Sequence, residues 1–239
     1  MKLGTIAVAT ALSVLVASCG SGSFLESVFS LEKRAAVGAT PYTIDELKAA
    51  IARYGADIER VADARGHEAD YWRMLAYKYL DERMYGDAHD AAMKALYTYP
   101  DNPGLYYVAG VSAAYFAARA AADPNAMPTR AQWLDAAEAA YQESIQLGQN
   151  TKAMYGLAVL YSFEMERHED ALVPLEALLA KDPGNLDALF VYARSLYGAG
   201  RPQDAVDAYD RILASAKVEE TKALATENKK RILGELYGE

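Results

Sequence analysis

The sequence contains almost no cysteine and no excess of basic charge. Cys19 is the only cysteine among 239 residues, so no disulfide can form within the chain. Acidic residues outnumber basic ones and give a formal net charge of −9, which argues against nucleic acid or anionic lipid as partners of the protein surface. Stability must therefore come from packing, in one sizeable core or a solenoid.

Motifs of catalysis are missing as well. There is no GxGxxG or GxxxxGK[ST] phosphate-binding loop, no GxSxG turn and no HExxH zinc motif. The three histidines, His67, His89 and His168, stand next to acidic residues, and we interpret them as surface or turn residues. Nothing alternates as a β-strand does. The sequence predicts an all-α protein that is not an enzyme and holds no metal.

The one long apolar run lies at the start of the sequence. It covers residues 3–16, follows a basic Lys2, and ends in small residues directly before Cys19. At about 14 residues it is shorter than the roughly 20 of a transmembrane helix, and it fits a secretory signal. The Gly-Ser run at 20–23 favours a tether. An ordinary cleaved signal with a chance cysteine, or an uncleaved anchor, are the alternatives.

The tetrapeptide Val-Ala-Ser-Cys at 16–19 resembles a bacterial lipobox. The resemblance implies a signal peptide over 1–18, acyl chains on Cys19 as the only added group, and a tether over 19–40. Two or more acyl chains anchor a protein stably, whereas one does not. Glycine at position 20 resembles the pattern of outer-membrane destination, which implies an envelope protein facing the periplasm.

From about residue 69 the chain repeats itself with a period near 34 residues. In 69–102, one set of residues falls on a single helical face and a second set forms another stripe before Pro100. The first set is Trp72, Leu75, Ala76 and Tyr79, and the second is Ala88, Ala92 and Ala95. The spacing predicts two antiparallel helices that meet through small residues.

This pattern resembles the tetratricopeptide repeat (TPR), which implies an α-α superhelix (TPR solenoid) of about four helix pairs with flanking N- and C-terminal helices. The array is expected over 69–219, and its units are 69–102, 103–151, 152–185 and 186–219. The second unit carries an insertion near 117–131, either a functional loop or a tolerated one, in which Thr129 is a candidate N-cap. The turn of the third unit is one residue longer than the consensus.

Two flanking segments complete the organisation. The segment 41–68 is expected to be helical, because Thr43 and Glu46 form a capping box before an apolar stripe that predicts one buried side. That stripe consists of Ile44, Leu47, Ile51, Tyr54, Ile58 and Val61. The segment 220–239 is expected to close the solenoid as a capping helix, with Leu224, Ile232 and Leu236 on its apolar side.

The concave groove of such a solenoid is lined by the first helix of each pair. Tyrosine is abundant, with 18 copies against 5 phenylalanines, and it suits half-wet interfaces. The residues expected in a partner-binding groove are Arg73, Tyr77, Tyr107, Tyr115, Tyr155, Phe163, Phe190, Arg194 and Tyr197. Packing between helices is the alternative for each of them. Some TPR domains resemble one another in a carboxylate clamp of Lys, Asn and Arg. The corresponding positions here carry Arg73, Tyr77, Tyr107 and Val111, so no such clamp is expected and a chaperone-tail adaptor is not predicted.

The resemblance implies a membrane-anchored scaffold that binds an envelope protein, as a peptide or a helix in the groove, during envelope assembly, secretion or transport. The alternative is a periplasmic carrier or co-receptor for a small hydrophobic ligand or a solute-binding protein, with the insertion at 117–131 as a lid. Nucleic acid is not expected as a partner.

Overall fold

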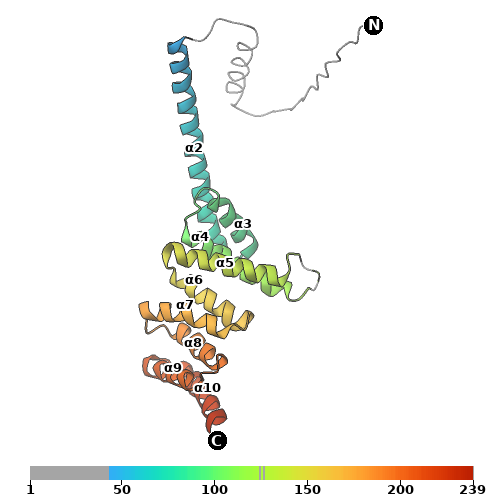
Figure 1. Ribbon diagram of the computed structural model, residues 1–239, viewed down its shortest axis with the longest axis vertical. Coiled ribbons are helices and arrows are strands. Elements are labelled where there is room, and N and C mark those ends of the chain that lie inside the picture. Colours follow the sequence, from blue (N-terminus) through green and yellow to red (C-terminus); the bar gives the residue numbers. More distant parts are fainter. Residues whose placement is uncertain (1–42, 124, 126, 239) are drawn as a thin grey trace, which may run out of the picture. The chain divides into compact units, whose positions relative to one another are not determined.

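The computed structural model describes residues 43–123, 125 and 127–238, and every regular element in these ranges is helical (Figure 1). The predictions for the signal peptide, Cys19 and the tether concern residues outside this described part. The chain divides into two compact units, 1–58 and 59–239. The helices are α2 (Ile44–Asp81), α3 (Tyr85–Leu96), α4 (Pro103–Ala120), α5 (Arg130–Gly148), α6 (Thr151–Val159), η1 (Leu160–Glu164), α7 (His168–Lys181), α8 (Leu186–Gly198), α9 (Pro202–Ser215) and α10 (Glu219–Tyr237).

The second unit is a solenoid of antiparallel helix pairs, as predicted. The C-terminal part of α2 pairs with α3, α4 with α5, α6 and η1 with α7, and α8 with α9, while α10 packs on α9. Alanines lie where the helices meet: Ala76, Ala88, Ala158 and Ala205 are fully buried. Their small side chains let the helix backbones approach closely.

Three of the first helices begin in the same way. Asn102, Asn150 and Asn185 are the N-caps of α4, α6 and α8, and each side-chain oxygen accepts a backbone N–H of the first helical turn. Asparagine is among the best N-cap residues, and replacing such a cap costs about 1 kcal/mol. These caps fix where each first helix starts.

The insertion in the second repeat lengthens both of its helices. Only residues 121–129 lie between α4 and α5, and Thr129 closes a capping box with Gln132, as predicted for this N-cap. Phe116 of α4 stacks on Trp133 of α5, with ring centroids 4.7 Å apart, and His89 of α3 meets that tryptophan edge-on at 5.8 Å. The interpretation of His89 as a surface residue is therefore wrong, because it packs in an aromatic cluster.

The extra residue of the third repeat is accommodated by a π-helical turn, η1. Such turns insert one residue into a helix without ending it. A charged network holds the end of this turn, since Arg167 pairs with Glu138 at 3.0 Å and with Asp170 at 2.6 Å. The Tyr161 hydroxyl also donates to Glu138 at 2.7 Å.

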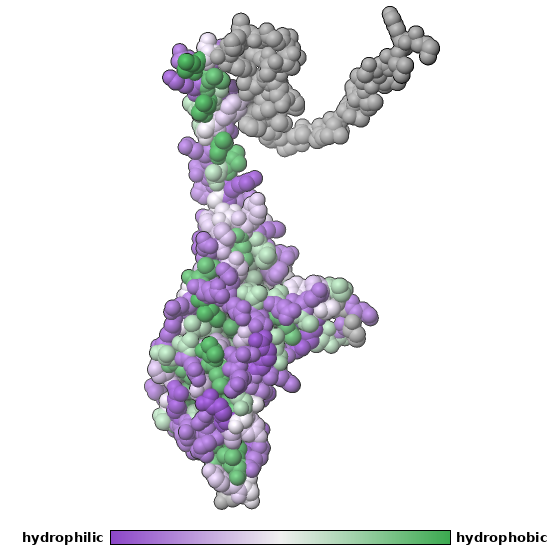
Figure 2. Space-filling model, in the orientation of Figure 1, coloured by the Kyte–Doolittle hydropathy of each residue, from purple (hydrophilic) through white to green (hydrophobic). Residues whose placement is uncertain are grey.

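Helix α2 begins at the predicted capping box, where Thr43 and Glu46 exchange hydrogen bonds, and the boundary expected at 68/69 falls inside it. The prediction that its N-terminal stripe is buried is wrong: Ile44 and Ile51 are each 72% exposed, and Ile58 is 67% exposed. Figure 2 shows this apolar surface as green patches on the visible face of the helix. A 3,4 spacing specifies an amphipathic helix, but it does not specify what covers the apolar side.

The closing helix α10 differs from its prediction in its register. Ile232 is buried as expected, but Leu224 and Leu236 are half exposed, and Ala225 takes the second buried position. Alanine presents little apolar surface, so the sequence pattern predicted that Leu224, and not the neighbouring Ala225, is buried.

Candidate functional site: a pocket between α8 and α10

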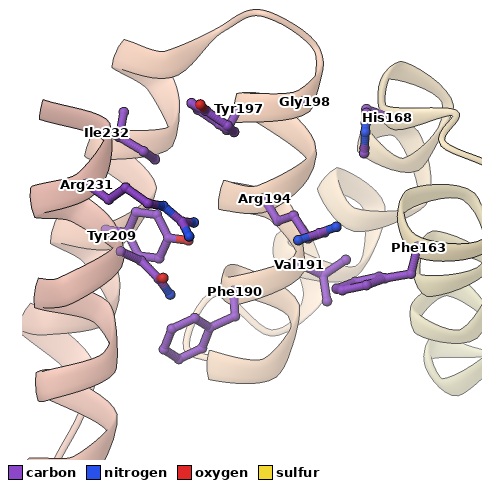
Figure 3. A pocket seen from close by; sticks show the side chains of 11 residues that line it. Phe163, His168, Phe190, Val191, Arg194, Tyr197, Gly198, Tyr209, Arg231 and Ile232 are labelled. Carbon is purple, nitrogen blue, oxygen red and sulfur yellow. The ribbon is translucent and has the colours of Figure 1, made fainter. Parts of the chain in front are cut away.

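A cavity of about 390 Å³ opens between the third repeat, the fourth repeat and the closing helix (Figure 3). Helix α8 forms its floor, η1 and α7 form one side, and α9 and α10 form the other. The residues that line it are Phe163, His168, Phe190, Val191, Arg194, Tyr197, Gly198, Tyr209, Asn228, Arg231 and Ile232. We refer to this cavity as the α8–α10 pocket.

Four of the nine predicted groove residues meet in this pocket, namely Phe163, Phe190, Arg194 and Tyr197. The π-helical turn bears Phe163, and the first helix of the fourth repeat bears the other three. The residue types also suit a binding site, because the aromatic rings offer apolar surface and the arginine offers hydrogen-bond donors.

The other five predicted groove residues do not line the pocket. Arg73 pairs with Asp70 at 3.0 Å, and the hydroxyl of Tyr77 lies against Gly104. Tyr115 stacks on Tyr85 of α3, with ring centroids 4.1 Å apart, so it packs between helices. The remaining two, Tyr107 and Tyr155, are half-buried against the core, and burial raises the pKa of each hydroxyl.

Two arginines give the pocket a positive character in a chain that is acidic overall. The guanidinium of Arg194 lies over the ring of Phe163, 4.4 Å from its centroid. Arg231 reaches in from α10 toward Tyr209 (Figure 3). Among the described residues neither arginine forms an ion pair. Both guanidinium groups therefore keep donors for a carboxylate or phosphate ligand.

The tyrosines of the pocket are fixed by different forces. Burial raises the pKa of Tyr209, and the charges of Arg231 and Arg194 partly oppose that shift. A hydrogen bond to Glu235 raises the pKa of Tyr197 and orients its ring at the rim. Because the Tyr197 hydroxyl already donates its one proton to Glu235, Tyr209 is the tyrosine of the pocket that can donate a hydrogen bond to a ligand.

One wall of the pocket depends on a close approach between two helices. The His168 ring of α7 lies directly on Gly198 of α8, where an added Cβ would come within 2.4 Å of the ring. The Nδ1 atom of His168 is buried and has no hydrogen-bond partner in the described part of the chain. The interpretation of this histidine as a solvated turn residue is therefore wrong.

Sequence analysis did not identify His168, Tyr209, Asn228 or Arg231 as pocket residues. Asn228 and Arg231 lie on the closing helix, outside the repeat pattern that guided the assignment of groove positions. One feature of the sequence could have identified Arg231. It directly precedes Ile232, which is buried, so it lies at the edge of the buried side of that helix.

A second, more open hollow lies between α2 and α3. It measures about 730 Å³, and Trp72 and Lys94 form its centre through a cation–π contact of 3.9 Å. Because none of the nine predicted groove residues lines this hollow, the α8–α10 pocket is the better candidate site. No helix in the described ranges is long and apolar enough to cross a membrane, and no group of metal-ligating side chains occurs there.

Comparisons with known proteins agree with this architecture. The sequence profile described as "Tetratricopeptide repeat" matches residues 162–227, which include much of the pocket. MamA from Desulfovibrio magneticus RS-1, as a fragment from residue 41 to its end, has a structure similar to this chain. The TM-score is 0.53 and the identity 14%, over 70% of this chain and 93% of that one. No curated protein matches the sequence significantly.

Two further structures share the fold. The thermophilic TPR protein TTC0263 of Thermus thermophilus has a TM-score of 0.54 at 16% identity, over 76% of this chain and 93% of that one. A tetratricopeptide repeat protein of Parabacteroides merdae ATCC 43184 has a TM-score of 0.56 at 18% identity, over 71% of this chain and 61% of that one. The chain therefore has the fold of TPR proteins, and residues 162–227 match the model of the repeat itself.

Proposed function

We propose that this protein is a membrane-anchored TPR lipoprotein that serves as an interaction scaffold in envelope assembly, secretion or transport. Cys19 carries the lipid, and the solenoid presents the α8–α10 pocket to an envelope protein. The observation that supports this proposal most is the gathering of four predicted groove residues in one cavity with two arginines that form no ion pair among the described residues. The segment that fits this cavity offers an acidic group beside an apolar side chain.

The partner is tested by photo-crosslinking in intact cells. A photoreactive amino acid replaces Tyr197 at the rim of the pocket, and in a matched control it replaces Val173, which is 71% exposed on α7 outside the pocket. We expect one discrete cross-linked polypeptide from position 197 and none from position 173. Equal products from both positions, or none from either, would contradict the proposal.

The anchor is tested separately by Cys19→Ala. We expect this variant to leave the membrane fraction and to keep binding the partner in a purified mixture. Retention of the variant in the membrane at its unprocessed length would instead support an uncleaved anchor. Because the cross-link and the fractionation are independent, failure of one half of the proposal leaves the other measurable.

A carrier function is the second candidate, because a cavity of about 390 Å³ falls within the size range of small-molecule sites. None of the described residues of the loop at 121–129 lines the α8–α10 pocket, so the expectation that the insertion covers the ligand as a lid finds no support at this cavity. Mass spectrometry of the purified protein separates the two functions, since a carrier retains a small apolar molecule and a scaffold does not.

A further inference from the structure

The exposed stripe of α2 has the spacing of a coiled-coil seam. Ile44, Ile51 and Ile58 lie seven residues apart, at heptad position a, and Leu47 lies at position d of the first heptad. Tyr54 and Val61 continue the d positions. All five aliphatic residues of this set are exposed, from 46% for Leu47 to 72% for Ile44 and Ile51. A surface helix of a monomer does not need such a seam on its outer side.

The flanking positions agree with pairing between identical helices. Positions e and g carry the small residues Ala50, Gly55, Ala62 and Ala64, with only Lys48 and Asp57 charged. In a parallel pair in register, position g of one helix faces position e of the next heptad of the other. Asp57 then meets Ala62 and Lys48 meets Thr43, so no like charges face each other. Most of the charge lies at b, c and f, away from the seam.

We propose that two copies of this protein associate through residues 44–61 of α2 as a parallel coiled coil in register. Isoleucine at all three a positions, with leucine at the first d position, is the combination that favours two parallel strands. The seam ends after Val61, because the next two seam positions are Arg65 and Glu68, which line the hollow beside α3. With about two and a half heptads the association is weak and depends on protein concentration.

The parallel arrangement predicts a specific contact between equal residues. Helix axes in such packing lie about 8–10 Å apart and each Cα lies about 2.3 Å from its axis, so facing a positions come about 5 Å apart. That distance lies within the Cα separation of disulfides, about 4.4–6.8 Å. A cysteine at position 58 therefore meets the same cysteine of the second copy, whereas in an antiparallel pair it would not.

The test is cysteine cross-linking of the full chain in intact cells. Ile58→Cys is compared with Ala56→Cys, which places the cysteine at position f of the same turn region, on the outer side of the helix. Mild oxidation is expected to convert Ile58→Cys into a covalent species of twice the mass and to leave Ala56→Cys and the unmodified chain as monomers. As a further control, both variants are also made with Cys19→Ala, so that no dimer can form through Cys19.

A second pair of variants tests the seam without moving the cysteine. In the Ile58→Cys chain, Ile51→Lys is expected to reduce the dimer yield at least tenfold, because it places a charge in the seam. Ala52→Lys adds the same charge at position b and is expected to preserve the yield. Circular dichroism verifies that both variants keep their helices.

Three outcomes overturn the proposal. One is a monomer from Ile58→Cys, which results if residues 24–37 of the same chain or another protein covers the stripe. Another is equal dimer from Ile58→Cys and Ala56→Cys. The third is a yield that Ile51→Lys leaves unchanged.

Discussion

The two ends of helix α2 carry the same apolar spacing in different surroundings. Toward its C-terminus, Trp72 and Leu75 pack against a core in which Ala76 is fully buried. Toward its N-terminus, Ile44 and Ile51 are exposed at the same 3,4 spacing. The difference lies in the residues that meet them: the array supplies alanines such as Ala88 and Ala92 on a facing helix, and these allow close approach. The spacing of the apolar residues specifies an amphipathic helix, and the small alanines on a facing helix indicate that another helix packs closely against it.

The largest expected difference between the two ends is in stability. Leu105→Ala removes a fully buried side chain from the array and is expected to lower the free energy of unfolding by about 2–5 kcal/mol. Ile51→Ala removes an exposed side chain and is expected to change the unfolding of the array by less than about 0.5 kcal/mol. Urea unfolding followed by circular dichroism measures both. Similar losses in the two variants would show that the stripe belongs to the core.

A smaller contrast separates two helical glycines. Gly198→Ala forces the new Cβ into the His168 ring and is expected to cost about 1–3 kcal/mol. Gly55→Ala on α2 meets no atom within 4 Å and is expected to stabilise its helix by up to about 1 kcal/mol. Thermal unfolding compares the two substitutions. Stabilisation by both would mean that the histidine moves aside without cost, and the proposed wall of the pocket would lose its support.

Alkaline pH is expected to weaken the array. Burial raises the pKa of Tyr141, whose ring lies against Gly110 and Gly156. The stability that follows from this shift is complete below the unfolded pKa of about 10, and it is lost as pH rises above that value toward the folded pKa. Relative to the unmodified chain, Tyr141→Phe should gain about 1 kcal/mol between pH 10 and 11. The same difference between the two chains at pH 9 and pH 11 would contradict this assignment.

The smallest expected effect concerns a predicted groove residue outside the pocket. Arg73 forms a half-exposed pair with Asp70, so Arg73→Ala is expected to change stability by no more than about 1 kcal/mol. It is also expected to leave the cross-link at position 197 intact, whereas Arg194→Ala weakens it. Loss of the cross-link in Arg73→Ala would extend the site beyond the α8–α10 pocket.

The sequence predicted the fold well because the repeat is encoded locally. The alanines at 76, 88 and 95 and the turn glycine at 200 mark helix contacts and turns that depend on near neighbours in the chain. The extra residue of the third repeat was visible too, although its conversion into a π-helical turn that carries Phe163 was not. In the second repeat the position of the insertion was evident, whereas the aromatic cluster of Phe116, Trp133 and His89 was not, because its side chains come from three different helices.

The site was only partly predictable for a physical reason. Phe163, Phe190, Arg194 and Tyr197 share a cavity because consecutive first helices are neighbours, as the repeat implies. Arg231 lies in the pocket because of the rotation of the closing helix α10, which the repeat pattern does not specify. His168 lies in the pocket because Gly198 has no side chain and lets the histidine ring contact α8. The burial of the α2 stripe was wrongly predicted, because its 3,4 spacing specifies an apolar side of the helix without specifying which surface covers that side.

The cross-link at position 197 in chains with altered pocket charge tests the account most directly. Arg194→Ala combined with Arg231→Ala removes both guanidinium groups, and the matched control, Arg73→Ala combined with Lys78→Ala, removes two positive charges from α2. The account predicts that the yield of the cross-linked polypeptide falls at least tenfold in the pocket variant and stays unchanged in the control. An unchanged yield in the pocket variant, with its helices intact, would contradict the α8–α10 pocket as the partner-binding site.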